Sequence, residues 1–119
     1  MIINLVKNKI TEGRVFENPG GGVTEVVRVT ELGIYYKRGN SKMLIKYGDI
    51  EKTYLEFKGK TVSTKDLRFF NSKVFDSKKG GHSCNCTVFF LILEECGLIN
   101  DVILGNGKCG NPFYVRIKA

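Results

Sequence analysis

The sequence has few of the residues on which common catalytic sites depend. Its 119 residues include a single histidine, His82. Glu94 and Glu95 are adjacent, so they would point to different sides of a helix rather than form a carboxylate pair. General acid–base and nucleophilic catalysis need reactive side chains placed beside one another. With one histidine and no clear acid–base pair, the sequence predicts a protein that is not an enzyme.

The spacing of the cysteines does not favour a metal site. The four cysteines are Cys84, Cys86, Cys96 and Cys109. With His82, the first two form the pattern H-x-C-x-C, which differs from the C-x2-C of common structural zinc sites. The sequence therefore predicts free thiols, no bound metal and no cofactor.

Long apolar segments are missing as well. No window of about 18 apolar residues is present, so the sequence predicts no membrane span and no membrane partner. Residues 1–6 are apolar, but Lys7 and Lys9 follow at once and leave no room for the core of a secretory signal. These features predict a cytoplasmic location.

Positive charge, by contrast, is plentiful. The chain has 19 Lys and Arg residues against 12 Asp and Glu residues, a net charge of +7. Its 42% hydrophobic content and its length suit one domain over residues 1–119. The excess charge indicates a negatively charged partner such as a nucleotide or nucleic acid, although many basic proteins have no such partner.

The first half of the chain predicts an antiparallel β-meander. Runs of β-branched and aromatic residues alternate with glycine-containing turns. We expect about four strands here, at residues 13–17, 24–30, 34–38 and 41–47. The pattern of residues 1–12 fits either a short strand or a short helix.

The second half predicts helices and two closing strands. Asp49 is the expected cap of a helix over residues 50–57, and residues 63–66 have the form of a capping box before a short helix over residues 66–70. Residues 71–81 should form a loop. The chain's most apolar run, residues 88–93, should lie in a buried central helix from Cys86 to Cys96, capped by Asn85 and closed by Gly97.

Two final strands, residues 101–104 and 112–117, flank a glycine-rich loop. The fold class is therefore α+β: an N-terminal antiparallel β-meander, two C-terminal helices and a closing β-hairpin or strand. Helices followed by a hairpin with a basic loop also fit a winged-helix layout. The same elements fit a sheet closed by its last strands.

Three loops are candidate binding sites. They are residues 80–85, with a double glycine and the only histidine; residues 37–42, a basic hairpin tip; and residues 105–113, with Lys108 and close-set glycines. Each loop also fits an ordinary turn without a ligand. A nucleotide would need cations for phosphate, an aromatic face for the base and polar groups for the ribose. The predicted ligand-binding residues are Arg38, Asn40, Phe75, His82, Ser83, Asn85, Lys108, Asn111, Phe113 and Arg116.

Nucleic-acid binding is the alternative hypothesis. A recognition helix needs a polar, basic and exposed face. The central helix is apolar and ends in Glu94 and Glu95, so it does not suit a DNA groove. Binding would instead come from the basic loops, mainly through phosphates.

In the order of its elements the chain resembles the phage anti-Thoeris sponge family of the first type. The N-terminal sheet would be residues 13–47, and the helices residues 50–71 and 86–97. The Lys-, Ile- and Asn-rich composition also suits a low-GC bacterial host. The resemblance implies a non-enzymatic homo-oligomer in the bacterial cytoplasm that captures cyclic ADP-ribose-type signals and so blocks host defence. No binding residue is carried over from the family, including in the RGNS (38–41) and GHSCNC (81–86) segments.

Overall fold

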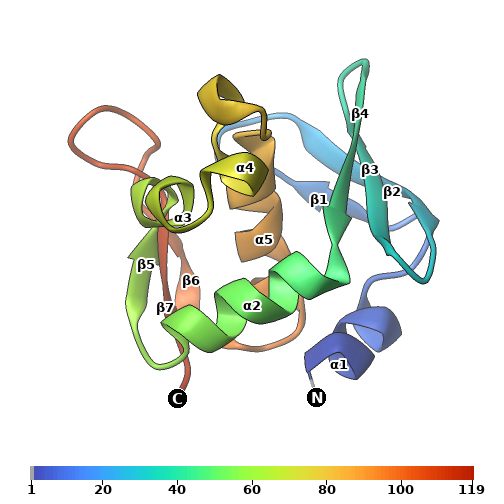
Figure 1. The fold of residues 1–119 in the computed structure, drawn as a ribbon, viewed down its shortest axis with the longest axis horizontal. Coiled ribbons are helices and arrows are strands. Elements are labelled where there is room, and N and C mark those ends of the chain that lie inside the picture. The colour runs from blue at the N-terminus through green and yellow to red at the C-terminus, as the bar shows by residue number, and fades with distance from the viewer. Residues whose placement is uncertain (1) are drawn as a thin grey trace.

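The computed structural model describes residues 2–119 and begins with a helix and a four-stranded antiparallel sheet (Figure 1). The strand order is β1-β2-β3-β4, so the predicted meander is confirmed. Within residues 1–12, which fitted either a strand or a helix, Ile2–Lys9 form a helix, and Met1 lies outside the described residues. The elements are α1 Ile2–Lys9, β1 Val15–Glu17, β2 Val23–Val29, β3 Gly33–Arg38 and β4 Ser41–Lys46.

One face of the meander is buried because apolar residues alternate along its strands. Val26 and Tyr36 are paired across β2 and β3, and both are buried. Ile34 and Ile45 form the next buried pair, across β3 and β4. Successive side chains of a strand point to opposite faces, so the polar residues between them face away from the core.

The second half contains helices and a second antiparallel sheet, with strand order β5-β7-β6. A helix, a strand, further helices and a hairpin follow one another, and the first strand pairs with the last. This element order and the pairing of β5 with β7 fit the winged-helix alternative as a layout, with residues 105–113 in the place of the wing. The elements are α2 Tyr47–Phe57, β5 Thr61–Ser63, α3 Thr64–Phe70, α4 Ser72–Phe75, η1 Ser77–Lys79, α5 Cys84–Glu95, β6 Ile99–Leu104 and β7 Tyr114–Ile117.

All three predicted helices begin two or three residues earlier than the sequence prediction, and α3 begins at Thr64 rather than Asp66. Helix α2 begins at Tyr47, and Asp49 lies in its first turn rather than at the cap. Helix α5 begins at Cys84, which places Asn85 inside the helix. The capping box of α3 is confirmed: the Ser63 side chain accepts from the Asp66 backbone N–H, and the Asp66 carboxylate accepts from the Ser63 backbone N–H. Gly97 follows α5 with φ 71°, as a helix-closing glycine should.

Further element boundaries were wrong or missed. Residues 71–81 form the short helices α4 and η1 instead of a loop. Strand β5 was not expected, because three residues are too short to give a strand pattern. Strand β6 begins at Ile99, two residues before its predicted start, and strand β7 begins at Tyr114, two residues after its predicted start.

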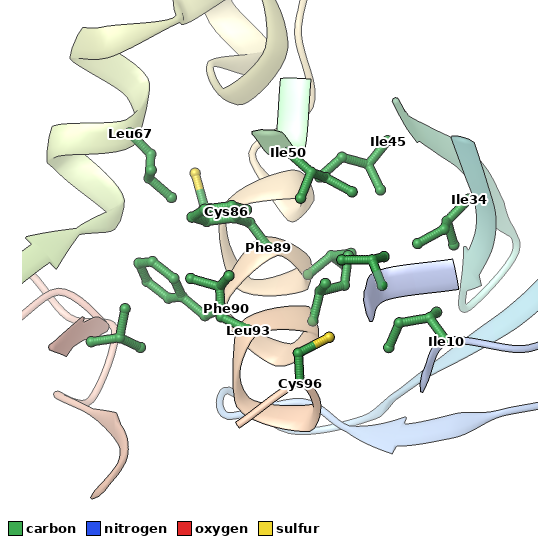
Figure 2. Packing of buried hydrophobic residues seen from close by; sticks show 14 of the residues in the cluster. Ile10, Ile34, Ile45, Ile50, Leu67, Cys86, Phe89, Phe90, Leu93 and Cys96 are labelled. Carbon is green, nitrogen blue, oxygen red and sulfur yellow. The ribbon is translucent and has the colours of Figure 1, made fainter. Parts of the chain in front are cut away.

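Helix α5 is the centre of the core. Its residues Val88 to Leu93 are all buried, and Phe89, Phe90 and Leu93 have no exposed surface. Figure 2 shows side chains leaving α5 in several directions, with Leu67 of α3 near Cys86 and with Ile34 and Ile45 on the side of the meander. A helix that is apolar all round has to be enclosed in this way.

Gly33 shows how closely β3 and β4 pack, and it gives a first prediction. A Cβ atom at Gly33 would collide with the carbonyl oxygen of Ile45. We expect Gly33→Ala to lower the free energy of unfolding by about 1–3 kcal/mol, the usual cost of overpacking. Urea unfolding followed by circular dichroism measures the change.

Gly48→Ala is the matched control, because a Cβ atom at Gly48 in α2 would meet no other atom within 4 Å. We expect it to leave the stability unchanged or to raise it by up to about 1 kcal/mol. Equal losses in both variants would contradict the packing described for Gly33.

Candidate functional site

Three basic segments lie along one edge of the molecule. The β3–β4 hairpin tip, helix η1 and the loop after β6 all extend toward the top of Figure 1. The chain termini and α2 lie at the opposite edge (Figure 1). We call residues 37–42, 64–82 and 105–112 together the basic edge.

The basic edge accounts for the whole net charge of the chain. It contains nine Lys and Arg residues and two Asp residues, a net charge of +7. The remainder has ten Lys and Arg residues and ten Asp and Glu residues, so it is neutral. Six of the seven lysines at the edge are exposed, including Lys78, Lys79 and Lys108. A one-sided distribution of this kind creates a positive potential over the edge.

A cleft lies within the basic edge, between α3 and the loop after β6. Its volume is about 310 Å³. Three cations line it: Lys65 and Arg68 from α3, and Lys108 from the loop. We call it the α3 cleft. The remaining lining residues are Thr64, Gly107, Cys109, Gly110 and Pro112.

The loop that carries Lys108 is held in one conformation by its glycines. Gly107 has φ 78°, and a Cβ atom there would lie 2.5 Å from the Phe113 ring. Only glycine therefore fits over that ring. The Lys108 backbone N–H donates to the Asn106 side chain over 2.9 Å, and the Asn111 backbone N–H donates to the Lys108 carbonyl over 2.9 Å. These contacts place Lys108 at the tip of the loop.

The structure places the exposed predicted residues on several separate segments rather than around one pocket. Asn40 is exposed at the β3–β4 tip, His82 and Ser83 are exposed before α5, and Asn111 is exposed on the same loop as Lys108. Arg116 lies on β7, between β5 and β6, with an Nη1 atom 3.9 Å from the Asp101 carboxylate. These residues do not assemble into a single nucleotide pocket.

Neither predicted aromatic residue offers an open ring face for a base. Phe75 has 0% of its surface exposed and packs edge-on against Phe89, with ring centroids 6.1 Å apart. Phe113 is half-buried beneath Gly107 and Gly20. Phe75 is therefore a core residue. The sequence did not indicate this burial, because the residues around Phe75 are mostly polar.

Asn85 is a core residue as well, and its amide is fully occupied. It is 3% exposed, its Nδ2 donates to the Val74 carbonyl over 3.0 Å, and its Oδ1 accepts from the Tyr36 hydroxyl. Burial raises the pKa of Tyr36 well above its usual range, so the hydroxyl keeps the proton it donates. Asn85 thus joins α5 to the meander and to α4 instead of facing a ligand.

Arg38 is partly committed to the sheet. Its Nε donates to the Thr24 hydroxyl over 2.7 Å. The Thr24 hydroxyl in turn donates to the Asn18 side chain. Arg38 therefore contributes charge to the basic edge from a fixed position.

Sequence reasoning missed Lys65 and Arg68 as site residues. The capping box did predict the helix that carries them, and the pattern K-x-x-R within it was visible. What the sequence could not show is that α3 lies beside the loop after β6. The Thr64 backbone N–H donates to the Phe113 carbonyl over 3.0 Å, and this hydrogen bond holds the start of α3 beside the end of the loop after β6.

The cysteines do not form a reactive or metal-binding cluster within residues 2–119. Burial raises the pKa of Cys86 to about 12, against the opposing effect of nearby Arg68, so this thiol stays protonated at neutral pH. Cys109 is exposed on the loop after β6. Across the part of the chain that the structure describes, no three His, Cys, Asp or Glu side chains gather as a metal site would require.

In the described residues no helix combines the length and apolar character needed to cross a membrane. No protein-family model matches the chain, and neither does any curated protein or solved structure with which it was compared. The function proposed below therefore rests on the charge and geometry of this chain alone.

The structural role of Asn85 gives a second prediction. Tyr36→Phe and Asn85→Ala each leave a buried polar group without its partner, so each should lower the free energy of unfolding by about 1–3 kcal/mol. The double variant should lose less than the sum of the two, because both changes remove the same hydrogen bond. Chemical denaturation of the four proteins measures this coupling. Additive losses, or an unchanged stability in Asn85→Ala, would contradict the role.

Proposed function

We propose that this chain binds nucleic acid, and that it does so through phosphate contacts along the basic edge. The observation that carries the proposal is the confinement of the whole net charge of +7 to three segments at one edge. Lys and Arg side chains that neutralise phosphates release counterions, and this release supplies most of the affinity of such binding.

The distribution of the charge favours a polymer over a single nucleotide. The molecule extends 34 Å along its longest axis, and the three segments are spread along that direction in Figure 1. Duplex DNA carries one negative charge per about 1.7 Å of its axis, so a short stretch reaches all three segments at once. A single nucleotide reaches only one of them.

The winged-helix layout supports the proposal in part. The loop after β6 carries Lys108 at its tip, where a wing would contact the phosphate backbone. Helix α5 occupies the place of a recognition helix, but it is buried between the meander and the other helices. Helix α5 therefore cannot contact base edges in the major groove. The remaining phosphate contacts carry little sequence information, so the proposed binding has little sequence specificity.

Lysine replacement tests the proposal. The variant Lys78→Gln/Lys79→Gln/Lys108→Gln should bind a 20-nucleotide fluorescent oligonucleotide about tenfold more weakly or worse at about 50 mM salt. The slope of log affinity against log salt concentration should fall by about 2 to 3, close to one per lysine. Fluorescence anisotropy measures both quantities.

The control variant is Lys52→Gln/Lys58→Gln/Lys60→Gln, which removes the same charge from α2 and the turn after it. All three lysines are exposed at the opposite edge. We expect its affinity to fall less than about threefold, since exposed charges beyond a Debye length are largely screened. Equal losses in the two variants would mean that net charge, rather than the basic edge, attracts the oligonucleotide.

The α3 cleft supports a second candidate function, the sequestration of a cyclic ADP-ribose-type nucleotide by a homo-oligomer that antagonises bacterial anti-phage defence. The cleft volume of about 310 Å³ falls in the range of small-molecule sites, and three cations line it. The cleft has no open aromatic face among its lining residues, which makes it a phosphate subsite more than a complete nucleotide site.

Native mass spectrometry separates the two candidates. After incubation with cyclic ADP-ribose isomers, a sponge should carry the intact nucleotide as an oligomer and release it unchanged on denaturation. Arg68→Gln in the α3 cleft should abolish that binding, and Lys52→Gln should not. A protein that carries no nucleotide but retards oligonucleotides would exclude sequestration, and a changed nucleotide would indicate an enzyme.

A further inference from the structure

Phe69 on α3 is the most exposed large apolar side chain of the described residues. Its exposed fraction is 94%, against 64% for Leu55 and 37% for Phe70. Burial of an aromatic ring away from water is favourable, and the exposed Phe69 ring does not contribute this free energy to folding. The position therefore calls for a partner that covers the ring.

The backbone beneath Phe69 is firmly held. The capping box fixes the start of α3, and Leu67 has no exposed surface. The neighbouring Phe70 packs edge-on against Phe57 of α2, with ring centroids 5.4 Å apart. Phe69 is thus presented outward from a rigid helix, and a partner would not need to order this segment.

Cations lie on one side of the ring. Lys65 and Phe69 are four residues apart on α3, and such residues are neighbours on a helix surface. Lys65 and Arg68 also line the α3 cleft, together with Lys108. Phe69 itself lines a second depression on its other side, together with Glu56, Phe57, Asp66 and Phe70, and it borders the α3 cleft without lining it. A negatively charged chain should therefore follow the side of Lys65 and Arg68, not the side of the carboxylates.

We propose that Phe69 stacks on an unpaired base, and that the ligand of the basic edge is single-stranded nucleic acid. This inference rests on the proposed function and names its substrate class. Proteins that bind single strands combine a basic groove for the backbone with aromatic rings for the bases. In a duplex the base faces are already stacked on one another, so an exposed ring on a helix surface finds no free face.

A second copy of the chain is the competing occupant of this surface. One aromatic ring buries about 200 Å², roughly a quarter of the about 800 Å² that each partner contributes to a stable interface. The net charge of +7 on the basic edge also favours a negatively charged occupant over a second copy of the same chain. Charge complementarity therefore favours the nucleic acid.

Tryptophan fluorescence tests the stacking directly, because the chain contains no tryptophan. Phe69→Trp places the only tryptophan of the variant at the site, and its emission can be excited apart from that of the five tyrosines. Oligo(dT) should quench its emission on binding, and an abasic strand of the same length should not. Leu55→Trp on α2 is the matched control, since Leu55 is exposed away from the α3 cleft, and its emission should not change with either strand.

Affinity measurements complete the test. Phe69→Ala should bind oligo(dT) about five- to 100-fold more weakly and should bind the matching duplex as the wild type does. Leu55→Ala should change neither affinity. Circular dichroism of each variant confirms that it is folded.

The outcomes are distinguishable. If oligo(dT) binds in a lysine-dependent way but neither quenches Phe69→Trp nor binds Phe69→Ala more weakly, the stacking is overturned and the proposed function stands. If the wild type binds no oligonucleotide at about 50 mM salt, both are overturned. If sedimentation shows a wild-type dimer that Phe69→Ala dissociates, a second copy covers the ring and the inference is overturned.

Discussion

The enclosure of α5 is the constraint on which the rest of the structure depends. A helix with buried residues on every side has to be covered on every side, and no single sheet can do so. The meander covers one side, while α2, α3 and the second sheet cover others (Figures 1 and 2). The Asn85 side chain, bonded to Tyr36 and Val74, joins the start of α5 to this surrounding layer.

The same constraint determines where function can lie. Because α5 is buried in the core, it cannot enter a DNA groove. The net positive charge lies instead on the surrounding loops and on α3. Those loops carry the basic charge, and α3 carries both Lys65 and the exposed Phe69. A surface of this composition suits a flexible, phosphate-rich ligand with accessible base faces better than it suits a rigid duplex.

The sequence predicted the fold well where local chemistry decides it. β-Branched runs between glycine turns gave the meander, Ser63 and Asp66 gave the start of α3, and the apolar run gave α5. The prediction from the sequence failed where the same residue type occurs both in binding loops and in the core. Asn85 suits a helix cap, but in this chain it satisfies buried polar groups, and Phe75 belongs to the core although polar residues surround it in the sequence.

The site was less predictable than the fold. The charged loops were visible as loops, but their placement along one edge depends on how two distant halves of the chain pack. Lys65, Arg68 and Lys108 meet because α3 lies against the loop after β6, a contact between segments far apart in the sequence. Exposure is likewise a tertiary property, so nothing in DLRFF distinguishes the exposed Phe69 from the adjacent Phe70, which packs on Phe57.

The central claim is that nucleic acid binds along the basic edge, and NMR mapping of amide shifts tests it most directly. Titration of the isotope-labelled protein with oligo(dT) at low salt should shift amides in residues 37–42, 64–82 and 105–112, and should leave α1 and the outer face of α2 unchanged. Shifts confined to α1 and α2, or no shifts at all, would contradict the account.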